Sequence, residues 1–537
     1  METALAAYQT GNFALAYQEL SRIVADAYPV QPQHLLMLAQ SAAKMGKLSQ
    51  AGNLYLRAAT LLPEKSAALR KIAAEMKRQI IEADTPKALS RMETCRKMLR
   101  SGQETPAMLR EYFHDLRRYM AIDEQRIMTQ LLLDRLRAGD EALLALEPPE
   151  HFLAWCEDDV LLDRRVRLLA GGGGQDVVAP QAAGTGQPLK IGWLGHREEQ
   201  YDGSRLLLQS LAASPFTEAA EICFIDTGDG EPPEGVHSLL IAGLDDDQAR
   251  AALAAKGFDA IIDTGGPAAW RPQLLTRRIS PLHLALAGYP GPREGQICDG
   301  FISDTHLAGP AGKDLCGLPQ LPPFSCFTAA PPVPASAATS RESLGLPADA
   351  VVIAALHPPA HIGPKTADLW AEILTAAPNT VLWLGLPDAL TKANAKRWFG
   401  SLDLPEDRLI VSPAPADTEI PDWLSQADLA LDTVPFNGLG QTKAALWAHR
   451  PVVTMRGRLA GGRTSASLLA AAGLDDLVAT GPEDYVQKAV ALAQHPGLRQ
   501  QWTGRIAESL SASRIFDISA FAADLTALLT KGRAVKT

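Results

Sequence analysis

The stretch Asp428–Thr454, DLALDTVPFNGLGQTKAALWAHRPVVT, decides the fold. The apolar run at residues 429–431 has the length of a buried parallel strand, and residues 452–455 form the next one. Between them, a loop centred on Gly438 leads into a helix predicted over Gln441–Trp447. The helix start of such a βαβ unit offers unpaired N–H groups and positive dipole density to a phosphate. A ligand-free turn in a doubly wound sheet has the same pattern, so this stretch alone leaves both interpretations open.

The composition describes an ordinary globular protein of several domains. The chain has 537 residues, of which 47% are hydrophobic and 21% charged, and its length predicts two to four domains. A net charge of −10 argues against nonspecific nucleic-acid binding, which needs an excess of Lys and Arg. The six cysteines include no CxxC pair, so neither a zinc site nor a disulfide framework is predicted. No signal peptide or membrane span is recognisable, and a cytoplasmic location is expected.

The N-terminal part contains a repeat. The segment Gly11–Ala16, GNFALA, recurs as Gly46–Ala51, GKLSQA, with the glycines expected at tight turns and the alanines at close helix contacts. Pro29 and Pro63 are then expected to end the second helix of each pair. This pattern resembles the tetratricopeptide repeat, a helix pair of about 34 residues, although an unrelated helical hairpin has a similar signature. Stacked repeats present a groove, which implies a peptide or protein partner.

The rest of the chain changes from helices to alternating strands and helices. The helix-rich, charged segment before residue 171 is interpreted as a bridge that continues the repeat array, with its charges on a solvated face. A Gly/Pro/Ala-rich linker follows, and it is expected to carry so few buried contacts that a chain starting near Leu189 folds by itself. Two consecutive open α/β domains come next, with the cleft between them as the default ligand site. The predicted division is 1–86 repeats, 87–170 helical extension, 171–188 linker, 189–335 first α/β lobe, 336–510 second α/β lobe and 511–537 C-terminal helix.

Several segments of the α/β part resemble the O-GlcNAc-transferase-like (SPINDLY-like) glycosyltransferases. They occur in the family's order over about 330 residues, from the LKIGW of Leu189–Trp193 to the RTSAS of Arg463–Ser467. The intermediate matches are GFDAIID at 257–263, GYPG at 288–291, DGFISD at 299–304, SLGLP at 343–347, VLWL at 381–384, and the Asp432-Thr433, Asn437-Gly438 and Leu446-Trp447-Ala448 groups. The resemblance implies a GT-B fold, which is a pair of Rossmann-like α/β domains, after an N-terminal tetratricopeptide-like helical array. It also implies an inverting glycosyltransferase that needs no metal or other cofactor.

The polar residues of the family's donor site are only partly present. His361 occupies the position of the family's phosphate-binding Lys, Tyr201 stands where the family has a His, and the loop Asn437–Thr442 lacks the family's His and Thr pair. The resemblance implies catalytic roles for His361, Tyr201 and Asp263. The expected nucleotide-binding residues are Asn437, Gly438, Gly440, Gln441, Thr442, Lys443 and Arg463, with the loop glycines expected to be free to adopt positive φ.

Bacterial proteins with this layout resemble flagellin glycosyltransferases, and this resemblance implies a bacterial protein O-glycosyltransferase that modifies Ser or Thr. Because several contacts to a diphosphate are missing, a CMP-activated nonulosonic acid such as pseudaminic acid is the expected donor, and flagellin is the leading acceptor candidate. The acceptor protein is expected to bind the repeat array. The alternative is a catalytically inactive glycosyltransferase-like scaffold that binds its partners through the repeats.

Overall fold

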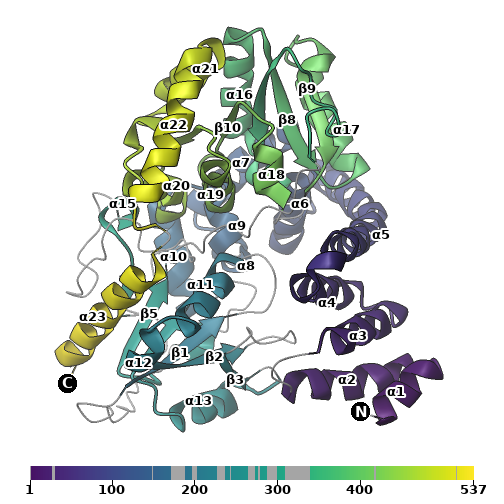
Figure 1. Ribbon diagram of the computed structural model, residues 1–537. Coiled ribbons are helices and arrows are strands. Elements are labelled where there is room, and N and C mark those ends of the chain that lie inside the picture. The colour runs from purple at the N-terminus through teal and green to yellow at the C-terminus, as the bar shows by residue number, and fades with distance from the viewer. Residues whose placement is uncertain are drawn as a thin grey trace. The chain divides into compact units, whose positions relative to one another are not determined.

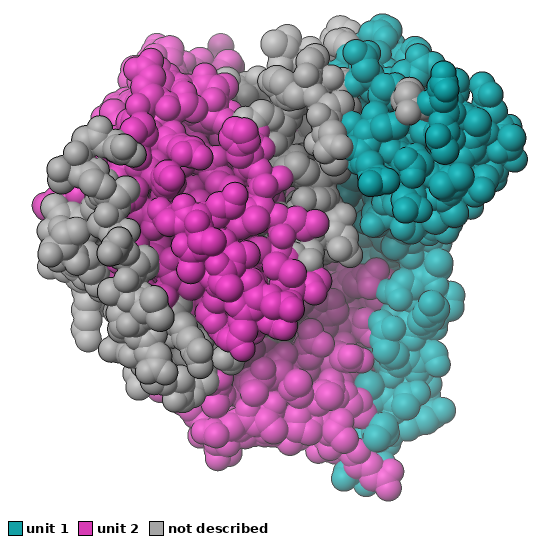
Figure 2. All heavy atoms as spheres, turned by 90° about the horizontal axis from the view of Figure 1, so that it is seen from below, with its two compact units in different colours: residues 1–102, 387–392 teal, residues 103–386, 393–537 magenta. Residues whose placement is uncertain are grey.

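The computed structural model describes residues 2–26, 31–147, 149–170, 188–195, 202–226, 236–241, 243–263, 272–275, 278–286, 299–308, 339–415, 419–515 and 517–536. The chain divides into two compact units, which Figure 2 shows in different colours. The first comprises Met1–Gly102 with the short segment Pro387–Lys392, and the second comprises the rest of the chain. The expected linker, at residues 171–187, lies outside the described residues.

The first unit consists of helices, as predicted (Figure 1). Gly11 and Gly46, with φ of 77° and 75°, end the first helix of each pair, which explains why glycine is needed there. Ala16 and Ala51 are fully buried between helices, and Pro63 follows the end of α4. The helices are α1 (Glu2–Gln9), α2 (Phe13–Asp26), α3 (Pro32–Lys44), α4 (Leu48–Leu61), the 3₁₀ turn η1 (Pro63–Lys65) and α5 (Ser66–Ser101). The expected turn at Pro29 lies outside the described residues.

The helical extension differs from the predicted bridge, because its helices from residue 103 on belong to the second unit. Met120 and Ile122 are buried in the core of the second α/β lobe. Asn394 also donates a hydrogen bond from Nδ2 to the carbonyl of Tyr119, at 2.7 Å. The helices concerned are α6 (Pro106–Arg118), α7 (Ile122–Arg137), α8 (Glu141–Leu146), α9 (Pro149–Leu153) and α10 (Asp159–Ala170).

The first α/β lobe is a six-stranded parallel sheet in the order β3-β2-β1-β4-β5-β6. Its strands are β1 (Leu189–Gly195), β2 (Ala220–Asp226), β3 (His237–Leu240), β4 (Ala260–Asp263), β5 (Leu282–Leu286) and β6 (Gly300–Ile302). The described helices are α11 (Asp202–Ala212), α12 (Phe216–Ala219), α13 (Asp246–Ala254), α14 (Pro272–Leu275) and α15 (Thr305–Ala308). The strand order is that of a doubly wound Rossmann sheet, whose order reverses between β1 and β4.

The second lobe repeats this topology in the order β12-β11-β10-β7-β8-β9, with the reversal between β7 and β10. Its strands are β7 (Val351–Ala355), β8 (Thr380–Leu386), β9 (Leu409–Pro413), β10 (Leu429–Leu431), β11 (Val452–Met455) and the short β12 (Val478–Ala479), which the sequence did not predict. The helices are α16 (Pro364–Ala376), α17 (Ala389–Gly400), α18 (Ile420–Leu424), α19 (Leu439–Trp447), α20 (Thr464–Ala471), α21 (Pro482–Gln494) and α22 (Pro496–Ala512). Short 3₁₀ turns are η4 (Pro359–His361), η5 (Glu406–Arg408), η7 (Ala460–Gly462) and η8 (Asp475–Leu477).

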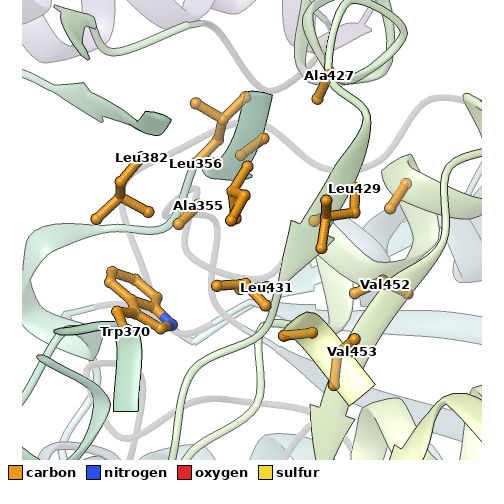
Figure 3. Close-up of a cluster of buried hydrophobic side chains, with 14 of the residues drawn as sticks. Ala355, Leu356, Trp370, Leu382, Ala427, Leu429, Leu431, Val452 and Val453 are labelled. Atoms are coloured by element: carbon orange, nitrogen blue, oxygen red, sulfur yellow. The ribbon is translucent and has the colours of Figure 1, made fainter. Parts of the chain in front are cut away.

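The core of the second lobe explains why its strands are almost wholly apolar. Figure 3 shows Leu429 and Leu431 of β10 among side chains from β7, β11 and α16, including Trp370, which is fully buried. Helices cover both faces of a parallel sheet, so alternation of apolar and polar residues disappears. Burial of each such side chain contributes about 1.5–3 kcal/mol to folding.

The last helix, α23 (Ile518–Lys536), returns to the first lobe. Phe521, Leu525 and Leu529 are buried with the strand residues Ile191 and Ile262 in one core, and Figure 1 shows the yellow helix beside the teal first lobe. The chain therefore crosses between the lobes a second time after α22. None of the helices in the described ranges is both long and apolar enough to span a bilayer.

Candidate functional site

The candidate site lies at the carboxyl ends of β7 and β10. In open α/β sheets ligands bind where the strand order reverses, because the loops from the two neighbouring strands leave in opposite directions and open a crevice. The loop after β7 carries His357 and His361, and the loop after β10 runs from Asp432 to Gly438. The topology thus brings together two loops that are about 75 residues apart in the sequence.

Asp432 holds the loop after β10 in place. Its buried carboxylate accepts hydrogen bonds from the N–H groups of Thr433 and Gly438, at 2.8 and 2.7 Å, and from the hydroxyl of Thr454, at 2.6 Å. His357 Nε2 lies 3.3 Å from the same carboxylate. Burial alone would raise the pKa of Asp432, but the hydrogen bonds and His357 outweigh it and hold that pKa below its ordinary value. Asp432 is therefore an ionised anchor that is saturated by protein groups.

Gly438 is required by the packing of His357. A Cβ on Gly438 would lie 2.4 Å from the imidazole atoms Cδ2 and Nε2 of His357, so no larger residue fits. The expectation of a positive φ is wrong here, since Gly438 has φ −85° and Gly440 belongs to the first turn of α19. The glycine therefore serves the approach of two loops rather than a left-handed turn.

The backbone after β10 is also tied to the loop after β11. Asn437 accepts no bond at Oδ1 from any described residue, although its N–H donates to the carbonyl of Gly461 at 3.0 Å and its Nδ2 to Thr433 at 3.2 Å. A Cβ on Gly462 would lie 2.2 Å from the carbonyl oxygen of Pro435, so these loops are in contact through backbone atoms. The buried Oδ1 of Asn437 is thus a polar atom available to a ligand.

The start of α19 presents N–H groups without a side-chain cap. Gly440 is exposed and Gln441 half-buried, and the first-turn N–H groups have no acceptor within the helix by geometry. The next two residues point elsewhere: the hydroxyl of Thr442 is bonded to Ser465 at 2.9 Å, and Lys443 is buried rather than directed to solvent. An anion at this edge would therefore be held by backbone N–H groups and the helix dipole.

His361 is a neutral imidazole in this environment. Burial, with the nearby His357 and Arg117, lowers the pKa of His361 to about 3. Its ring contacts that of Phe436 edge-on, with 5.0 Å between centroids, and its Nδ1 has no hydrogen-bond partner in the described part of the chain. The Nδ1 of His357 is likewise buried without a partner there. Two imidazoles, each with a buried Nδ1 that has no partner among the described residues, therefore lie beside the loop that leads into α19.

Arg463 does not point into this site but joins α20 to the first lobe. Its Nε donates to the carbonyl of His306 at 2.7 Å, and its Nη1 lies 3.4 Å from the carbonyl of Gly457. Burial, followed by the charge of Arg456, lowers the pKa of Arg463 from its ordinary value. The adjacent Ser467 donates to Asp304, so this segment is a contact between the lobes.

The remaining predicted residues lie elsewhere. Asp263 is buried at the carboxyl end of β4, at the reversal point of the first sheet rather than the second. Tyr201 and the GYPG segment at residues 288–291 lie outside the described residues. The sequence prediction also missed a support: the hydroxyl of Tyr485 donates to the carbonyl of Asp432 at 2.7 Å. For Asp432, which anchors the loop after β10, the sequence offered one signal: it is the first polar residue after its strand.

The two Rossmann-like lobes and a site at the reversal point of the second define a protein of GT-B fold. Residues 328–525, which include the second lobe, match the model of glycosyl transferase family 41. An O-GlcNAc transferase mutant from Thermobaculum terrenum has a similar fold, with a TM-score of 0.58, 20% identity and coverage of 100% of this chain and 98% of that one.

Two curated relatives are similar in sequence. A UDP-N-acetylglucosamine–peptide N-acetylglucosaminyltransferase from Caenorhabditis elegans is 29% identical over 191 residues, which cover 36% of this chain. The SPINDLY protein of Eustoma exaltatum subsp. russellianum, named a probable enzyme of the same kind, is 28% identical over 294 residues and 53% of this chain. The alignments span 17% and 32% of these relatives' own lengths.

Proposed function

We propose that this protein transfers a sugar from a nucleotide-sugar to a Ser or Thr hydroxyl of an acceptor protein. The observation that carries the proposal is the loop after β10, which Asp432 fixes so that the start of α19, His357 and the unprotonated His361 share one edge of the lobe that matches the glycosyl transferase family 41 model. A leaving phosphate bound at a helix start is stabilised by N–H groups already in position, without a metal.

His361 fits the role of a base once the donor is bound. A pKa of about 3 makes the imidazole unprotonated but a weak base. A phosphate beside it raises that pKa, because an anion favours the protonated ring. The hydroxyl of the acceptor then loses its proton to His361 or to the departing phosphate. Asp263 is the alternative base, from the first lobe.

We infer a donor with a single phosphate, as in a CMP-linked nonulosonic acid. The expected neutralising groups are limited: His361 is neutral, Arg463 donates to backbone carbonyls, and Lys443 is buried within α19. Each charged hydrogen bond missing from a diphosphate site costs about 1.5–3 kcal/mol. Titration calorimetry of the full chain should give tighter binding of CMP than of UDP, and tighter UDP binding contradicts this donor.

Gly438 gives a sharp test of the site. Gly438→Ala forces a methyl group into the imidazole of His357 and should weaken nucleotide binding at least tenfold, or about 1.4 kcal/mol. Gly504→Ala is a matched control, since a Cβ there meets nothing within 4 Å. If the two variants bind nucleotide with equal affinity, the loop after β10 is not part of the binding site.

The acceptor is proposed to bind the helix pairs of residues 2–101, with flagellin as the first protein to test. A chain that starts at Gln103 should keep nucleotide binding and lose glycosylation of the acceptor protein. The alternative function is an inactive scaffold. It is favoured because this chain lacks several of the polar residues that the family has in its donor site. Failure of CMP, UDP and GDP all to bind would support the scaffold over the enzyme.

A further inference from the structure

Arg117 connects the helical extension to the loop after β7. It lies on α6 with 4% of its surface exposed. Its Nη1 donates to the carbonyl of His151 on α9 at 2.9 Å, and its Nη2 donates to the carbonyl of Ala360 at 2.6 Å. The guanidinium also lies 5.9 Å from the ring centroid of Phe113. A buried arginine that bridges two backbone carbonyls fixes the distance between the segments that bear them.

Ala360 is the middle residue of η4, the turn that ends with His361. The turn has short backbone bonds of its own, from the N–H of His361 to Pro358 and from that of Ile362 to Pro359, at 2.9 and 3.0 Å. Pro358 and Pro359 have no N–H groups, so they donate no backbone hydrogen bonds that would hold the turn. The bond from Arg117 is therefore a fixed point of the turn outside its own backbone.

The same helices make a second, different kind of contact with this lobe. Arg126 of α7 pairs with Asp368 of α16 at 2.6 Å, but both side chains are about half exposed. An exposed ion pair contributes little, since both partners are well solvated when apart. Arg126 thus offers a matched control: an arginine of the same extension, bonded to the same lobe, which does not touch η4.

We propose that Arg117 is a positioning residue of the sugar-nucleotide site: it holds η4 so that His361 and His357 face the start of α19. The segment 103–170 is then a part of the site rather than a spacer between the repeats and the lobes. This inference rests on the proposed function for its effect on nucleotide binding, but not for its effect on the turn itself.

Hydrogen exchange of the full chain tests the effect on the turn without any ligand. Arg117→Gln should speed deuterium uptake in the peptide that covers residues 357–363 at least tenfold, while uptake in β8 stays unchanged. Arg117→Lys, which keeps the charge but not the two-pronged geometry, should give an intermediate rate and guards against a variant that fails to fold. Arg126→Gln should leave the peptide unchanged. Unchanged uptake in both Arg117 variants overturns the proposal, as does equal acceleration in Arg126→Gln.

Calorimetry on the same proteins tests the effect on the site. Arg117→Gln should weaken CMP binding at least tenfold, with a melting temperature close to that of the Arg126→Gln protein, whose affinity should stay within twofold of the wild type. A folded Arg117→Gln protein that binds CMP as tightly as the wild type overturns the positioning role. If the wild type binds no nucleotide, the proposed function fails while hydrogen exchange still decides whether Arg117 fixes the turn.

Discussion

Helix α5 and the helices α6–α10 are both rich in charged residues, yet they use their charges in opposite ways. On α5, Arg78 pairs with Glu75 and Glu82 through side chains that are about half exposed. In the segment from α6 to α10, by contrast, charged and polar side chains are buried, among them Asp115, Arg117, Gln125, Glu147 and Arg165. A run of charges is therefore a solvated face only where no second layer of protein covers the helix.

The buried charges are tolerated because each has found a partner. The carboxylate of Glu147 accepts a hydrogen bond from Trp155 Nε1 at 3.0 Å, and burial raises its pKa. Arg117 has two carbonyls as acceptors. Burying a polar group without such partners costs free energy, so these contacts decide which surface of the extension faces the α/β lobe.

The largest effect should come from removing the extension. A chain starting at Leu189 should be at least about 4 kcal/mol less stable than one starting at Gln103. It loses the burial of Met120 and Ile122, at about 1.5–3 kcal/mol each, and the hydrogen bonds to the carbonyl of Ala360 and from the amide of Asn394, at about 0.5–1.5 kcal/mol each. Urea unfolding followed by tryptophan fluorescence measures the difference. Equal stability of the two fragments would restore the expectation of a separable spacer.

Acid should destabilise the extension next. His114 and His151 stack with 4.7 Å between centroids, and burial first, then neighbouring charges, lowers the pKa of His114 to about 4 and that of His151 to about 3. The folded state binds fewer protons than the unfolded state below pH 6.5, so stability is present above that pH and lost towards pH 4. The slope should reach about 1.4 kcal/mol per pH unit for each histidine. Replacing both histidines with Gln should flatten the curve of unfolding free energy against pH between pH 6.5 and 4. An unchanged slope would mean that other groups take up the protons.

Replacing one carboxylate in each region should show directly the contrast between buried and exposed charges. Glu147→Ala should cost about 1–3 kcal/mol, because the half-buried indole N–H of Trp155 loses its acceptor. Glu147→Gln keeps an acceptor and should cost less, whereas Glu75→Ala on α5 should give no loss above the error of the measurement. Thermal denaturation of the three variants ranks them, and a Glu75 effect as large as that of Glu147 would contradict the comparison.

The smallest effect concerns the turns of the first unit. Gly46→Ala should cost about 1–2 kcal/mol, since its φ of 75° is unfavourable for a residue with a Cβ. Gly52→Ala, inside α4 with only ordinary contact at 3.8 Å, should instead stabilise by up to about 1 kcal/mol. Hydrogen exchange of the α3–α4 amides distinguishes the two substitutions. A loss of protection in both would mean that space, not φ, limits the turn.

Local patterns in the sequence were enough to predict the secondary-structure elements and the fold class. Apolar runs, glycines and prolines are local signals, and they predicted the helix pairs, the strands at residues 429–431 and 452–455 and the parallel α/β architecture. They also placed the loop around Gly438 at the end of a strand. Such features depend on neighbours in the chain, which is why they can be predicted from its order of residues.

The roles of the polar residues, by contrast, follow from contacts between distant parts of the chain. Four examples are the hydrogen bonds that Asp432 accepts, the packing of His357 against Gly438, the bond from Arg463 to His306 and the bond from Arg117 to Ala360. These contacts join residues that are 6 to 243 positions apart in the sequence. The same side chain is a ligand-binding group, an anchor or a solvated charge according to which acceptor lies within about 3 Å of it. That distance is set by the packing of whole layers, and no local pattern in the sequence records it.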